Sequence, residues 1–472
     1  MAQEITVPSR DPEWFRSVLP PARVEEFLAA ITEAHGLLNR RVVWNVNSTS
    51  RGGGVVELLR PLVGYARGAG IDVRWLVLDG TEGFFEVTKR IHNRLHGSTG
   101  DDGPLDERAR RVYEDVLADN LQSFVDRVRD VDVVIVHDPQ PAGLIPALRA
   151  RGATVIWRCH VGVDEPNEIV RETWRFLLPY VADANAVVFS REAFVWEGLD
   201  RNRVAVIPPT IDVFTPKNYD LQPQMIRAVL RVSGLVADGE APEPVTFERA
   251  DGTLARIERR AGIVEDEPVH VDDRLVVQVS RWDALKDPVG VIRGFGEHVP
   301  LETRAHLAYA GPAVDAVSDD PEGARMLRRS IEERNRLPAE VRRRIHLITL
   351  PMDDLDENAI MVNALQRQAH VIAQKSLAEG FGLTVAEAMW KGRPVVASRV
   401  GGIQDQVLDG ETGILIDDPR DLAAFGRAIS ELLSDADRAA RMGEAARERV
   451  RDRFVSVRSL LDYLALMRRL LR

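Results

Sequence analysis

Continuous runs of apolar residues alternate along the first half of the chain with segments of helical periodicity. Runs without regularly spaced polar residues are typical of parallel strands that are covered on both faces. These runs lie at residues 40–47, 72–80, 131–138, 153–160, 184–190 and 204–212. Segments such as EEFLAAITEAHGLL and YEDVLADNLQSFVDRV lie around and between them and carry a helical pattern. The alternation predicts βαβ units with parallel strands.

The second half of the chain repeats the same alternation. Its predicted strands lie at residues 273–282, 304–312, 343–351, 368–376, 393–402 and 413–418. A polar, proline-rich joint around 207–220 separates the two halves. We therefore predict an α/β fold with two doubly wound, Rossmann-like domains that face each other across a cleft. Ligands are expected at the carboxyl ends of the strands.

A charged segment at 236–268 departs from this alternation. It reads VADGEAPEPVTFERADGTLARIERRAGIVEDEP, and its periodicity is weak. We expect it to form a small hairpin appendage, and its residues do not indicate a role.

Composition narrows the class of protein. The 472 residues include 62 Lys and Arg and 73 Asp and Glu, which gives a formal net charge of −11. This balance argues against sequence-independent nucleic-acid binding, which needs a surface that neutralises phosphates. No apolar run approaches the length of a membrane span, and the start, MAQEITVPSR, lacks a basic segment followed by an apolar one. We expect a cytoplasmic protein that binds neither nucleic acid nor membrane.

The single cysteine, Cys159, excludes an internal disulfide framework and a multi-cysteine metal site. His160 follows it, but no second Cys/His pair has the spacing of metal ligands, so we predict no metal site. His137 and His160 both end predicted strands. A histidine in that place can bond a substrate hydroxyl or carbonyl, and a satisfied structural histidine is the alternative. The sequence contains neither a nucleophile elbow nor a kinase motif set.

A glycine-rich loop follows the first predicted strand. In NSTSRGGGVVELLR, Gly52, Gly53 and Gly54 open a predicted helix. Consecutive glycines let a backbone approach a phosphate or a sugar and offer bare N–H groups, although a tight strand-to-helix turn explains them as well. The pattern matches neither the dinucleotide fingerprint nor the Walker A loop.

Two basic residues follow the predicted strand at 274–280. In SRWDALKDP, Arg281 and Lys286 lie on the loop before a helix, where they could hold a diphosphate without a metal. An ordinary solvated loop is the alternative. Lysine is rare in this chain, and the few that occur therefore receive slightly more weight; they are Lys89, Lys217, Lys286, Lys375 and Lys391.

Two glutamates bracket a glycine-broken turn in QKSLAEGFGLTVAEAMWKGRPVVASRVGG. Glu379 precedes the turn, a helix is predicted from Leu383 to Trp390, and Glu387 lies about one turn into it. The helix N-terminus between the carboxylates favours a phosphate through its free N–H groups and its dipole. The arrangement indicates a ligand with an anionic middle and hydroxyls at both ends.

The motif EGFGLTVAE resembles the Glu-x7-Glu motif of retaining glycosyltransferases of family four, which have the GT-B fold. The glycine loop, SRWDALKDP and RPVVASRVGG occur in that family's order, so the resemblance covers nearly the whole chain. NSTSRGGGVVELLRPLV, HDPQPAGLIP and WRCHVGVDEPN are similar, more narrowly, to trehalose glycosyltransferring synthases. WRCH and HDPQP are also similar to retaining trehalose phosphorylases.

The resemblance implies a glucosyltransferase that joins nucleoside-diphosphate glucose to glucose, making α,α-trehalose reversibly. Residues 1–215 with a returning C-terminal helix at 455–472 would bind the acceptor. Residues 216–454, with the insertion near 236–268, would bind the nucleotide-sugar donor. A phosphorylase, or a family-four transferase with another acceptor, stays open. A catalytically silent nucleotide-sugar sensor and a dinucleotide oxidoreductase fit the residues less well.

Site roles follow from the resemblance residue by residue. Glu379 would touch the hydroxyls of the donor glucose, and Glu387 would take the ribose hydroxyls. The residues implied to be catalytic are Glu379, His160, Arg281 and Lys286. Arg281 and Lys286 would neutralise the pyrophosphate, and His160 would reach the transferred sugar near its C6 hydroxyl. The donor set adds Gly53, Gly54, Gly380, Phe381, Gly382, Leu383 and Thr384, with the backbone of Leu350 and Pro351 framing the base. The acceptor set is Asn47, Arg51 and Asp138.

The resemblance also implies a mechanism. The anomeric configuration is retained by front-face attack, and the leaving phosphate takes the acceptor proton, so the glutamate pair is not the acid and base of a glycosidase. We expect no metal and no cofactor besides the nucleotide-sugar substrate. A homodimer is compatible with the resemblance, while the preferred base stays open.

Overall fold

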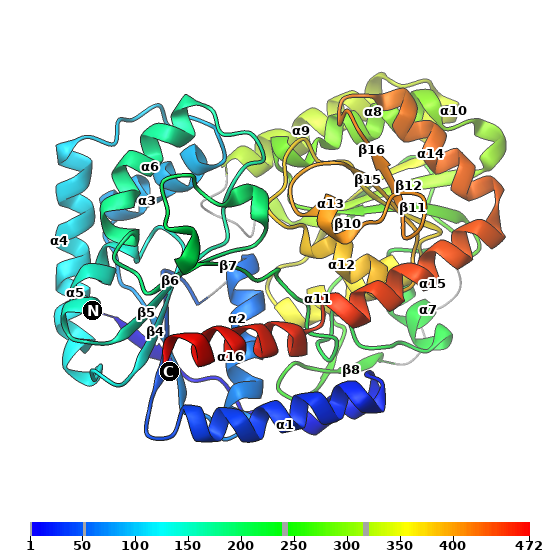
Figure 1. The fold of residues 1–472 in the computed structure, drawn as a ribbon. Coiled ribbons are helices and arrows are strands. Elements are labelled where there is room, and N and C mark those ends of the chain that lie inside the picture. The colour runs from blue at the N-terminus through cyan, green and yellow to red at the C-terminus, as the bar shows by residue number, and fades with distance from the viewer. Residues whose placement is uncertain (1, 51–52, 238–243, 315–320) are drawn as a thin grey trace. The chain divides into compact units, whose positions relative to one another are not determined.

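The structure is a computed structural model that describes residues 2–50, 53–237, 244–314 and 321–472 (Figure 1). The chain divides into two compact units, one formed by Met1–Thr210 with Phe454–Arg472 and the other by Ile211–Arg453. The division after Thr210 lies five residues before the predicted one at 215/216, and the division after Arg453 lies one residue before the predicted 454/455. Each unit is an α/β domain built on a seven-stranded sheet.

The sheet of the first unit has the order β1-β3-β2-β4-β5-β6-β7. All neighbours are parallel except β1, which pairs with β3 in antiparallel register. The strands are β1 (Gln3–Ile5), β2 (Val43–Asn47), β3 (Val73–Val77), β4 (Val133–His137), β5 (Thr154–Cys159), β6 (Ala186–Phe189) and β7 (Val204–Val206). Every apolar run predicted in this half contains one of them, whereas β1 was not predicted.

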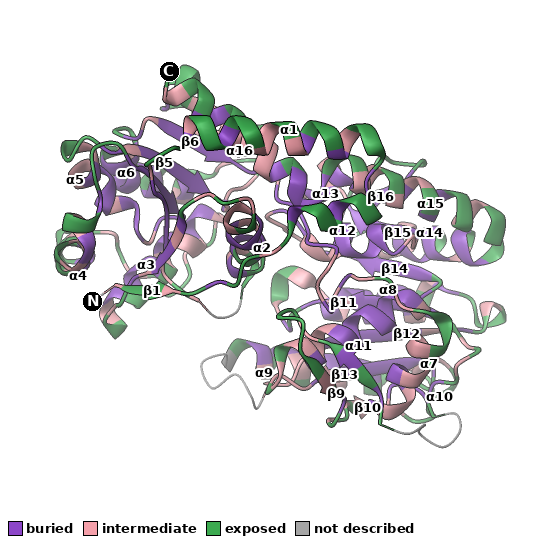
Figure 2. Cartoon of the chain, turned by 90° about the horizontal axis from the view of Figure 1, so that it is seen from below, coloured by how far each residue is buried: buried purple, intermediate pink, exposed green. Residues whose placement is uncertain are grey.

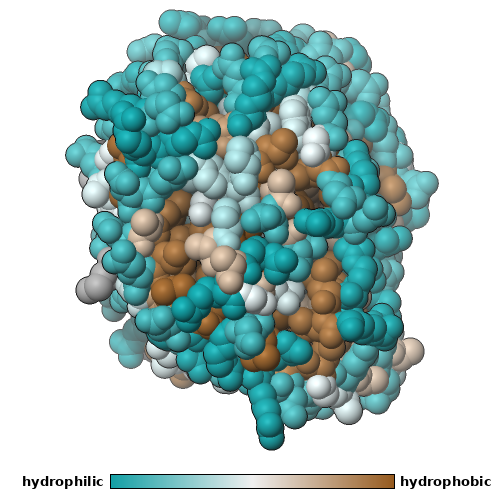
Figure 3. Space-filling view, turned by 60° about the vertical axis from the view of Figure 1, so that its left-hand side comes forward, coloured by the Kyte–Doolittle hydropathy of each residue, from teal (hydrophilic) through white to brown (hydrophobic). Residues whose placement is uncertain are grey.

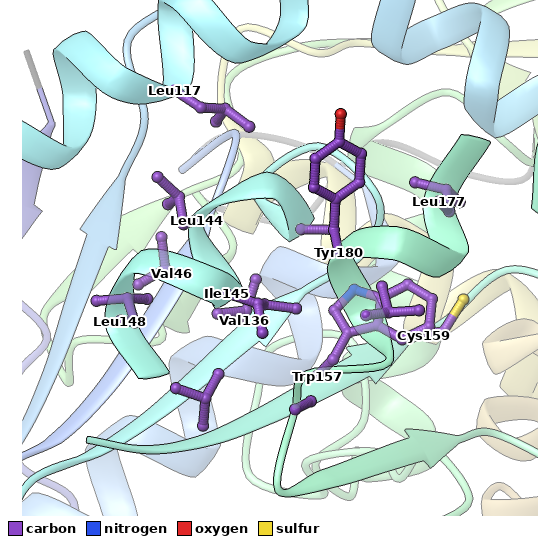
Figure 4. Packing of buried hydrophobic residues seen from close by; sticks show 14 of the residues in the cluster. Val46, Leu117, Val136, Leu144, Ile145, Leu148, Trp157, Cys159, Leu177 and Tyr180 are labelled. Carbon is purple, nitrogen blue, oxygen red and sulfur yellow. The ribbon is translucent and has the colours of Figure 1, made fainter. Parts of the chain in front are cut away.

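Alternate side chains of the central strands enter two hydrophobic clusters, one on each face of this sheet. On β4, Val134 and Val136 belong to one cluster, and Val133 and Ile135 belong to the other. Side chains alternate between the faces of a strand, so a strand covered on both faces must be apolar at every position. Figure 4 shows part of the first cluster, in which side chains of β4 and β5 pack against those of α5 and α6.

Helices cover both faces of the first sheet. They are α1 (Pro21–Leu37), α2 (Gly54–Gly68), α3 (Glu82–Leu95), α4 (Glu107–Phe124), α5 (Ile145–Ala150), α6 (Glu168–Val181) and α16 (Ser456–Leu470). The last of these returns from the C-terminal end of the chain and buries Leu466 and Met467 in the cluster that contains Ala34 of α1 and Val63 of α2. Thr210 and Ser459 join their hydroxyls at 2.9 Å where the chain leaves and re-enters the unit.

The sheet of the second unit has the order β10-β13-β12-β11-β14-β15-β16. Its strands are β10 (Gly262–Val264), β11 (Arg274–Val279), β12 (Ala305–Pro312), β13 (Ile345–Leu350), β14 (Val371–Gln374), β15 (Val395–Ser398) and β16 (Ile414–Ile416). All neighbours are parallel except β10 and β13. The parallel strands follow the doubly wound order, and the direction of the winding reverses between β11 and β14. Ligands of such sheets bind outside the carboxyl ends at this reversal.

The helices of the second unit also lie on both faces of their sheet, whose strands are mainly buried (Figure 2). They are α7 (Pro223–Val232), α8 (Pro288–His298), α9 (Pro321–Arg336), α10 (Ala339–Arg342), α11 (Leu355–Gln368), α12 (Leu383–Trp390), α13 (Ile403–Gln406), α14 (Leu422–Ser434) and α15 (Ala436–Arg453). Asp287, Asp354 and Asp421 cap α8, α11 and α14 by accepting backbone N–H groups.

The charged insertion forms a hairpin and then joins the main sheet. β8 (Thr246–Glu248) and β9 (Leu254–Arg256) pair in antiparallel register, and β10 follows them at the sheet edge. The backbone N–H groups of Glu258 and Arg259 donate to the buried carboxylate of Glu357 at 2.7 and 2.6 Å. The predicted hairpin is thus followed by an edge strand that the prediction did not include; residues 238–243 of the insertion lie outside the described residues.

Hydrophilic residues dominate the face of the molecule in Figure 3, with smaller hydrophobic patches among them. None of the helices in the described part of the chain is long and apolar enough to cross a membrane.

Candidate active site

Lys286 and Glu379 meet at the reversal point of the second sheet. Lys286 lies in a short 3-10 turn after β11, and Glu379 lies in the loop after β14, the neighbouring strand. The Lys286 Nζ atom is 2.5 Å from Oε2 of Glu379, and the side chains are only 14% and 11% exposed. The structure therefore brings together two of the predicted site residues where a doubly wound sheet binds its ligand.

A second ion pair fixes the two loops to each other. The side chain of Lys375 is fully buried and bonds Asp287, whose other oxygen accepts the N–H of Gly290 at 3.0 Å. The N–H of Leu377 donates to the carbonyl of Leu285 at 2.7 Å. Lys375 was noted in the sequence only as a rare lysine and not as a site residue. Its position indicates that it holds the loop of Lys286 against the loop of Glu379.

The first turn of α12 lacks a side-chain cap from its N-cap residue. Gly382 precedes it with φ +83°, and no described side chain caps the turn. The hydroxyl of Thr384 donates to Gln374 Oε1 at 3.0 Å. The N–H of Val385 donates to the carbonyl of Gly382 at 3.0 Å, while those of Leu383 and Thr384 receive no side-chain cap from Gly382. These two N–H groups and the positive end of the helix dipole suit an anion. Gly380 and Phe381 lie in the loop before Gly382, and Leu383 is the first residue of α12.

Gly401 lets a neighbouring loop approach this turn. Its φ is +49°, and a Cβ atom there would lie 1.7 Å from the carbonyl oxygen of Glu379. The N–H of Gly402 donates to the carbonyl of Gly380 at 2.9 Å. Gly401 and Gly402, the last residues of RPVVASRVGG, are therefore needed for the close contact of their loop with the backbone of the Glu379 loop.

Glu387 is buried on α12 and has one of its oxygens paired. Oε1 lies 2.9 Å from Nζ of Lys217, while Oε2 has no hydrogen-bond partner among the described residues. The sequence did not assign Lys217 to the site. An enclosed carboxylate oxygen without a donor carries a desolvation cost that a ligand hydroxyl would relieve.

Arg281 is placed differently from Lys286. Its side chain is 72% exposed and bonds Asp283 at 2.9 Å. In this structure it therefore does not form a cluster with Lys286 and Glu379, although it lies on the same loop after β11.

The glycine loop of the first unit lies at the carboxyl end of β2. Gly53 has φ +82°, which a residue with a side chain rarely adopts, and it precedes α2, which starts at Gly54. Arg51 and Gly52, which the sequence placed in the same loop, lie outside the described residues. Asn47 ends β2, accepts from Trp75 Nε1 at 2.8 Å and donates to the carbonyl of Thr49 at 2.7 Å. Both ends of its amide thus bond the protein.

His137 is the last residue of β4, and His160 follows the neighbouring strand β5 directly. Their rings are stacked with centroids 5.7 Å apart, and His137 Nδ1 is 3.4 Å from His160 Nε2. The other nitrogen of His137 is 3.0 Å from Oδ1 of Asn45. Burial, with a smaller contribution from Arg158, lowers the pKa of His137 to about 3 and that of His160 well below its usual value. Both rings are therefore neutral at neutral pH.

Asp138 supports the His160 backbone. It has a left-handed φ of +65°, and its Oδ1 accepts the N–H of His160 at 2.7 Å. Burial raises the pKa of Asp138 to about 7. The Arg158 guanidinium is buried nearby and donates to the carbonyls of Phe189 and Ile207 at 3.1 and 2.6 Å. Sequence reasoning missed Arg158, because an arginine inside a strand gives no signal of its own.

Two cavities adjoin these histidines within the first unit. One of about 20 Å³ is lined by His137, Arg158 and His160 together with Ser459, Tyr463 and apolar residues. The other, of about 120 Å³, lies among α1, α2 and α16 and is almost entirely apolar, with Asn45 and His137 among its walls. Cys159 is buried, and no group of three or more His, Cys, Asp or Glu that could hold a metal ion occurs in the ranges described.

Comparison with known proteins identifies relatives of both units. The family described as trehalose synthase, N-terminal domain, matches residues 45–196, and the family of glycosyl transferases group 1 matches residues 352–449. The chain is 36% identical over 449 residues to a trehalose synthase of Rubrobacter xylanophilus, with 94% of each chain covered. It is 25% identical to a trehalose phosphorylase of Pleurotus pulmonarius over 449 residues, which cover 89% of this chain and 56% of that one.

Solved structures share the fold. A UDP-forming α,α-trehalose-phosphate synthase from Burkholderia xenovorans, solved with glucose-6-phosphate, superposes with a TM-score of 0.64 and 17% identity. The match covers 91% of this chain and 99% of that one. The two Rossmann-like units are those of the GT-B fold, as the sequence predicted.

Proposed function

The chain belongs to the trehalose synthase family, within the family-four glycosyltransferases, and we propose that it moves glucose between a nucleoside diphosphate and free glucose. The product made or cleaved is α,α-trehalose, with retention of the anomeric configuration. The observation that carries this proposal is the position of Lys286, Glu379 and the first turn of α12, which has no side-chain cap, after the neighbouring strands β11 and β14. A cation, a helix N-terminus and a hydroxyl-binding carboxylate suit a sugar diphosphate.

On this proposal the second unit binds the donor. The diphosphate lies at the first turn of α12, where Lys286 and Arg281 compensate the charge that develops as the glycosidic bond breaks. Glu379 accepts hydroxyls of the transferred glucose. Glu387 accepts ribose hydroxyls at its unpaired oxygen, and the backbone after β13, at Leu350 and Pro351, frames the base.

The first unit binds the acceptor and touches the transferred sugar. A neutral His160 can both donate to and accept from hydroxyls, which suits an uncharged sugar better than an imidazolium does. Asp138, Asn47 and Arg51 belong to the acceptor side, while Gly53 and Gly54 offer backbone N–H groups to the donor. The low pKa of His160 supports this role.

The chemistry needs positioning and charge compensation rather than a protein base. The leaving diphosphate takes the proton of the attacking hydroxyl, so Glu379 orients the sugar without acting as a nucleophile. We propose that the reaction proceeds without a metal, because Lys286, Arg281 and the helix N-terminus supply the positive charge.

A second function is favoured by a specific similarity. The chain resembles trehalose phosphorylases over most of its length, although it spans only about half of theirs. In a phosphorylase, inorganic phosphate would replace the nucleoside diphosphate at the first turn of α12 and release glucose 1-phosphate.

The test is cleavage of trehalose in parallel reactions. One contains ADP, UDP, GDP or TDP, and the other contains inorganic phosphate. Nucleotide-glucose formed only in the first supports the proposal and identifies the base, while glucose 1-phosphate formed only in the second supports the phosphorylase. If neither product forms, the chain does not act on trehalose, and the proposal is wrong. Retention is checked by NMR, because the newly formed nucleotide-glucose must carry an α-anomeric proton.

A further inference from the structure

The two carboxylate oxygens of Glu387 differ in their hydrogen bonding. The residue is 2% exposed, Oε1 is paired with Lys217 at 2.9 Å, and Oε2 has no donor in the described part of the chain. A buried carboxylate is stable only when a charge compensates it and donors satisfy its oxygens. Lys217 compensates the charge of the carboxylate. A donor for Oε2 must come from another group.

The backbone around Lys217 is held firmly against α11 and α12. The carbonyl of Pro216 accepts from Asn363 Nδ2 at 2.9 Å, and the carbonyl of Asn218 accepts from Trp390 Nε1 at 3.0 Å. Asn218 is itself buried and bonds the carbonyl of Asp212 at 2.9 Å. Because both neighbours of Lys217 are tied to the unit, its ammonium reaches Glu387 from a fixed point on the segment by which the chain enters this unit.

Another lysine lies near Glu387 but is less suited to compensate it. The ammonium of Lys391 donates to the carbonyl oxygen of Glu387 at 3.2 Å and to Asn218 Oδ1 at 3.0 Å, so its contact is with the backbone of the glutamate. Burial lowers the pKa of Lys391 well below its usual value. Lys217, with 22% of its side chain exposed, is the cation that contacts the carboxylate itself.

We propose that Lys217 is a positioning residue of the nucleotide site, which holds Oε1 of Glu387 and so presents Oε2 to the ribose hydroxyls. The inference rests on the proposed function, in which Glu387 binds the ribose. It adds a residue from a distant part of the chain that touches the carboxylate and not the nucleotide. Loss of Lys217 then weakens nucleotide binding only by the contribution that the ribose hydroxyls make to the affinity.

The test compares ribose and dideoxyribose ligands by isothermal titration calorimetry. ADP, UDP and GDP are titrated into the full-length protein, and the tightest binder is then compared with its 2′,3′-dideoxy form. We expect Lys217→Met to weaken the ribose nucleotide at least about tenfold and to leave the dideoxy nucleotide unchanged, because hydrogen bonds to charged groups have this strength. Lys89→Met, at an exposed lysine of α3, is the matched control and should bind both ligands like the wild type.

Each outcome has a distinct meaning. An equal loss for both nucleotides, or no loss for either, overturns the role of Lys217. If the wild type binds the dideoxy form as tightly as the ribose form, the ribose contact of Glu387 is wrong, and the failure then lies in the proposed function. Should Lys217→Met not fold, Lys217→Arg replaces it, and we expect a smaller loss that is again confined to the ribose form.

A double variant separates positioning from direct contact. Glu387→Gln removes the charge that Lys217 compensates. We expect the loss in the double variant Lys217→Met/Glu387→Gln to be smaller than the product of the two single losses, because both act through one carboxylate. A product of independent losses would show that Lys217 contacts the nucleotide directly and would overturn the inference.

Discussion

The ammonium of Lys286 lies 2.5 Å from Oε2 of Glu379, although the two residues follow different strands of the sheet. In the free protein, each compensates the charge of the other in a nearly enclosed place. A bound sugar diphosphate would offer new partners to both, phosphate oxygens to the lysine and hydroxyls to the glutamate. The pair therefore holds the two side chains at the strand ends before the ligand arrives.

Removing the cation of this pair should slow the chemical step. We expect Lys286→Met to lower kcat by about 100-fold or more, because it removes charge compensation for the leaving diphosphate. The measurement is the steady-state rate of trehalose cleavage with nucleoside diphosphate. Lys89→Met should keep wild-type kcat, and a Lys286→Met enzyme with wild-type kcat would contradict the assignment of the diphosphate site.

The buried pair of Lys375 and Asp287 should matter for stability. We expect Lys375→Met to lower the free energy of unfolding by about 3–5 kcal/mol, because it leaves the Asp287 carboxylate without its cation. The double variant Lys375→Met/Asp287→Asn should recover part of that loss, since no charge is then left unpaired. Urea unfolding of the wild type and the two variants measures both effects, and equal losses in the single and double variants would show that the ion pair is not the cause.

Much of the fold could be predicted, because parallel strands covered on both faces are apolar throughout. The helix at Leu383–Trp390 was also predicted with its observed bounds, since Gly382 and the apolar pattern mark its start. The edge strands β1 and β10 could not be predicted. β1 lies in the polar start of the chain and β10 in the charged insertion, so neither stands out as an apolar run, and each exists because a partner strand offers its free edge.

The site was predictable only where residues share a local motif. Glu379, Gly382 and Glu387 belong to one stretch of sequence and its helix. Lys217 and Lys375 acquire their roles through contacts with Glu387 and Asp287, which lie far away in the chain, and lysine rarity was the one signal that singled them out. The pairing of Lys286 with Glu379 is likewise a result of strand order, which neighbouring residues do not encode.

Gly401 should be essential for the shape of the Glu379 loop. A Cβ atom at Gly401 would lie 1.7 Å from the Glu379 carbonyl oxygen, so Gly401→Ala must displace the loop. We expect a loss of trehalose cleavage together with a lower melting temperature. Gly410→Ala is the matched control, because Gly410 also has a positive φ, of +78°, but a Cβ atom there would meet no described atom within 4 Å. It should cost only the backbone strain of about 1–2 kcal/mol and keep the activity, and equal effects of both variants would contradict the steric argument.

The raised pKa of Asp138 should make stability depend on pH in a defined direction. Its value is about 7 in the folded protein against 3.8 for an ordinary aspartate, so the folded state holds a proton that the unfolded state releases. This contribution to stability is complete below about pH 3.8 and is lost as the pH rises through 7. Asp138→Asn keeps the acceptor for His160 N–H, tolerates the left-handed backbone and carries no titrating proton.

We therefore expect the melting temperature of Asp138→Asn, relative to the wild type, to rise steadily between pH 4 and pH 7, the window that the pKa shift defines. The lowered pKa of His137 has the opposite effect in this range, because there the unfolded state binds the additional proton. Both proteins contain His137, so the difference between their melting temperatures isolates Asp138. Asp102→Asn is the matched control, since Asp102 is an exposed aspartate that also has a positive φ, of +59°. A difference between Asp138→Asn and wild type that does not vary with pH would show that Asp138 is ionised in the folded protein throughout this range.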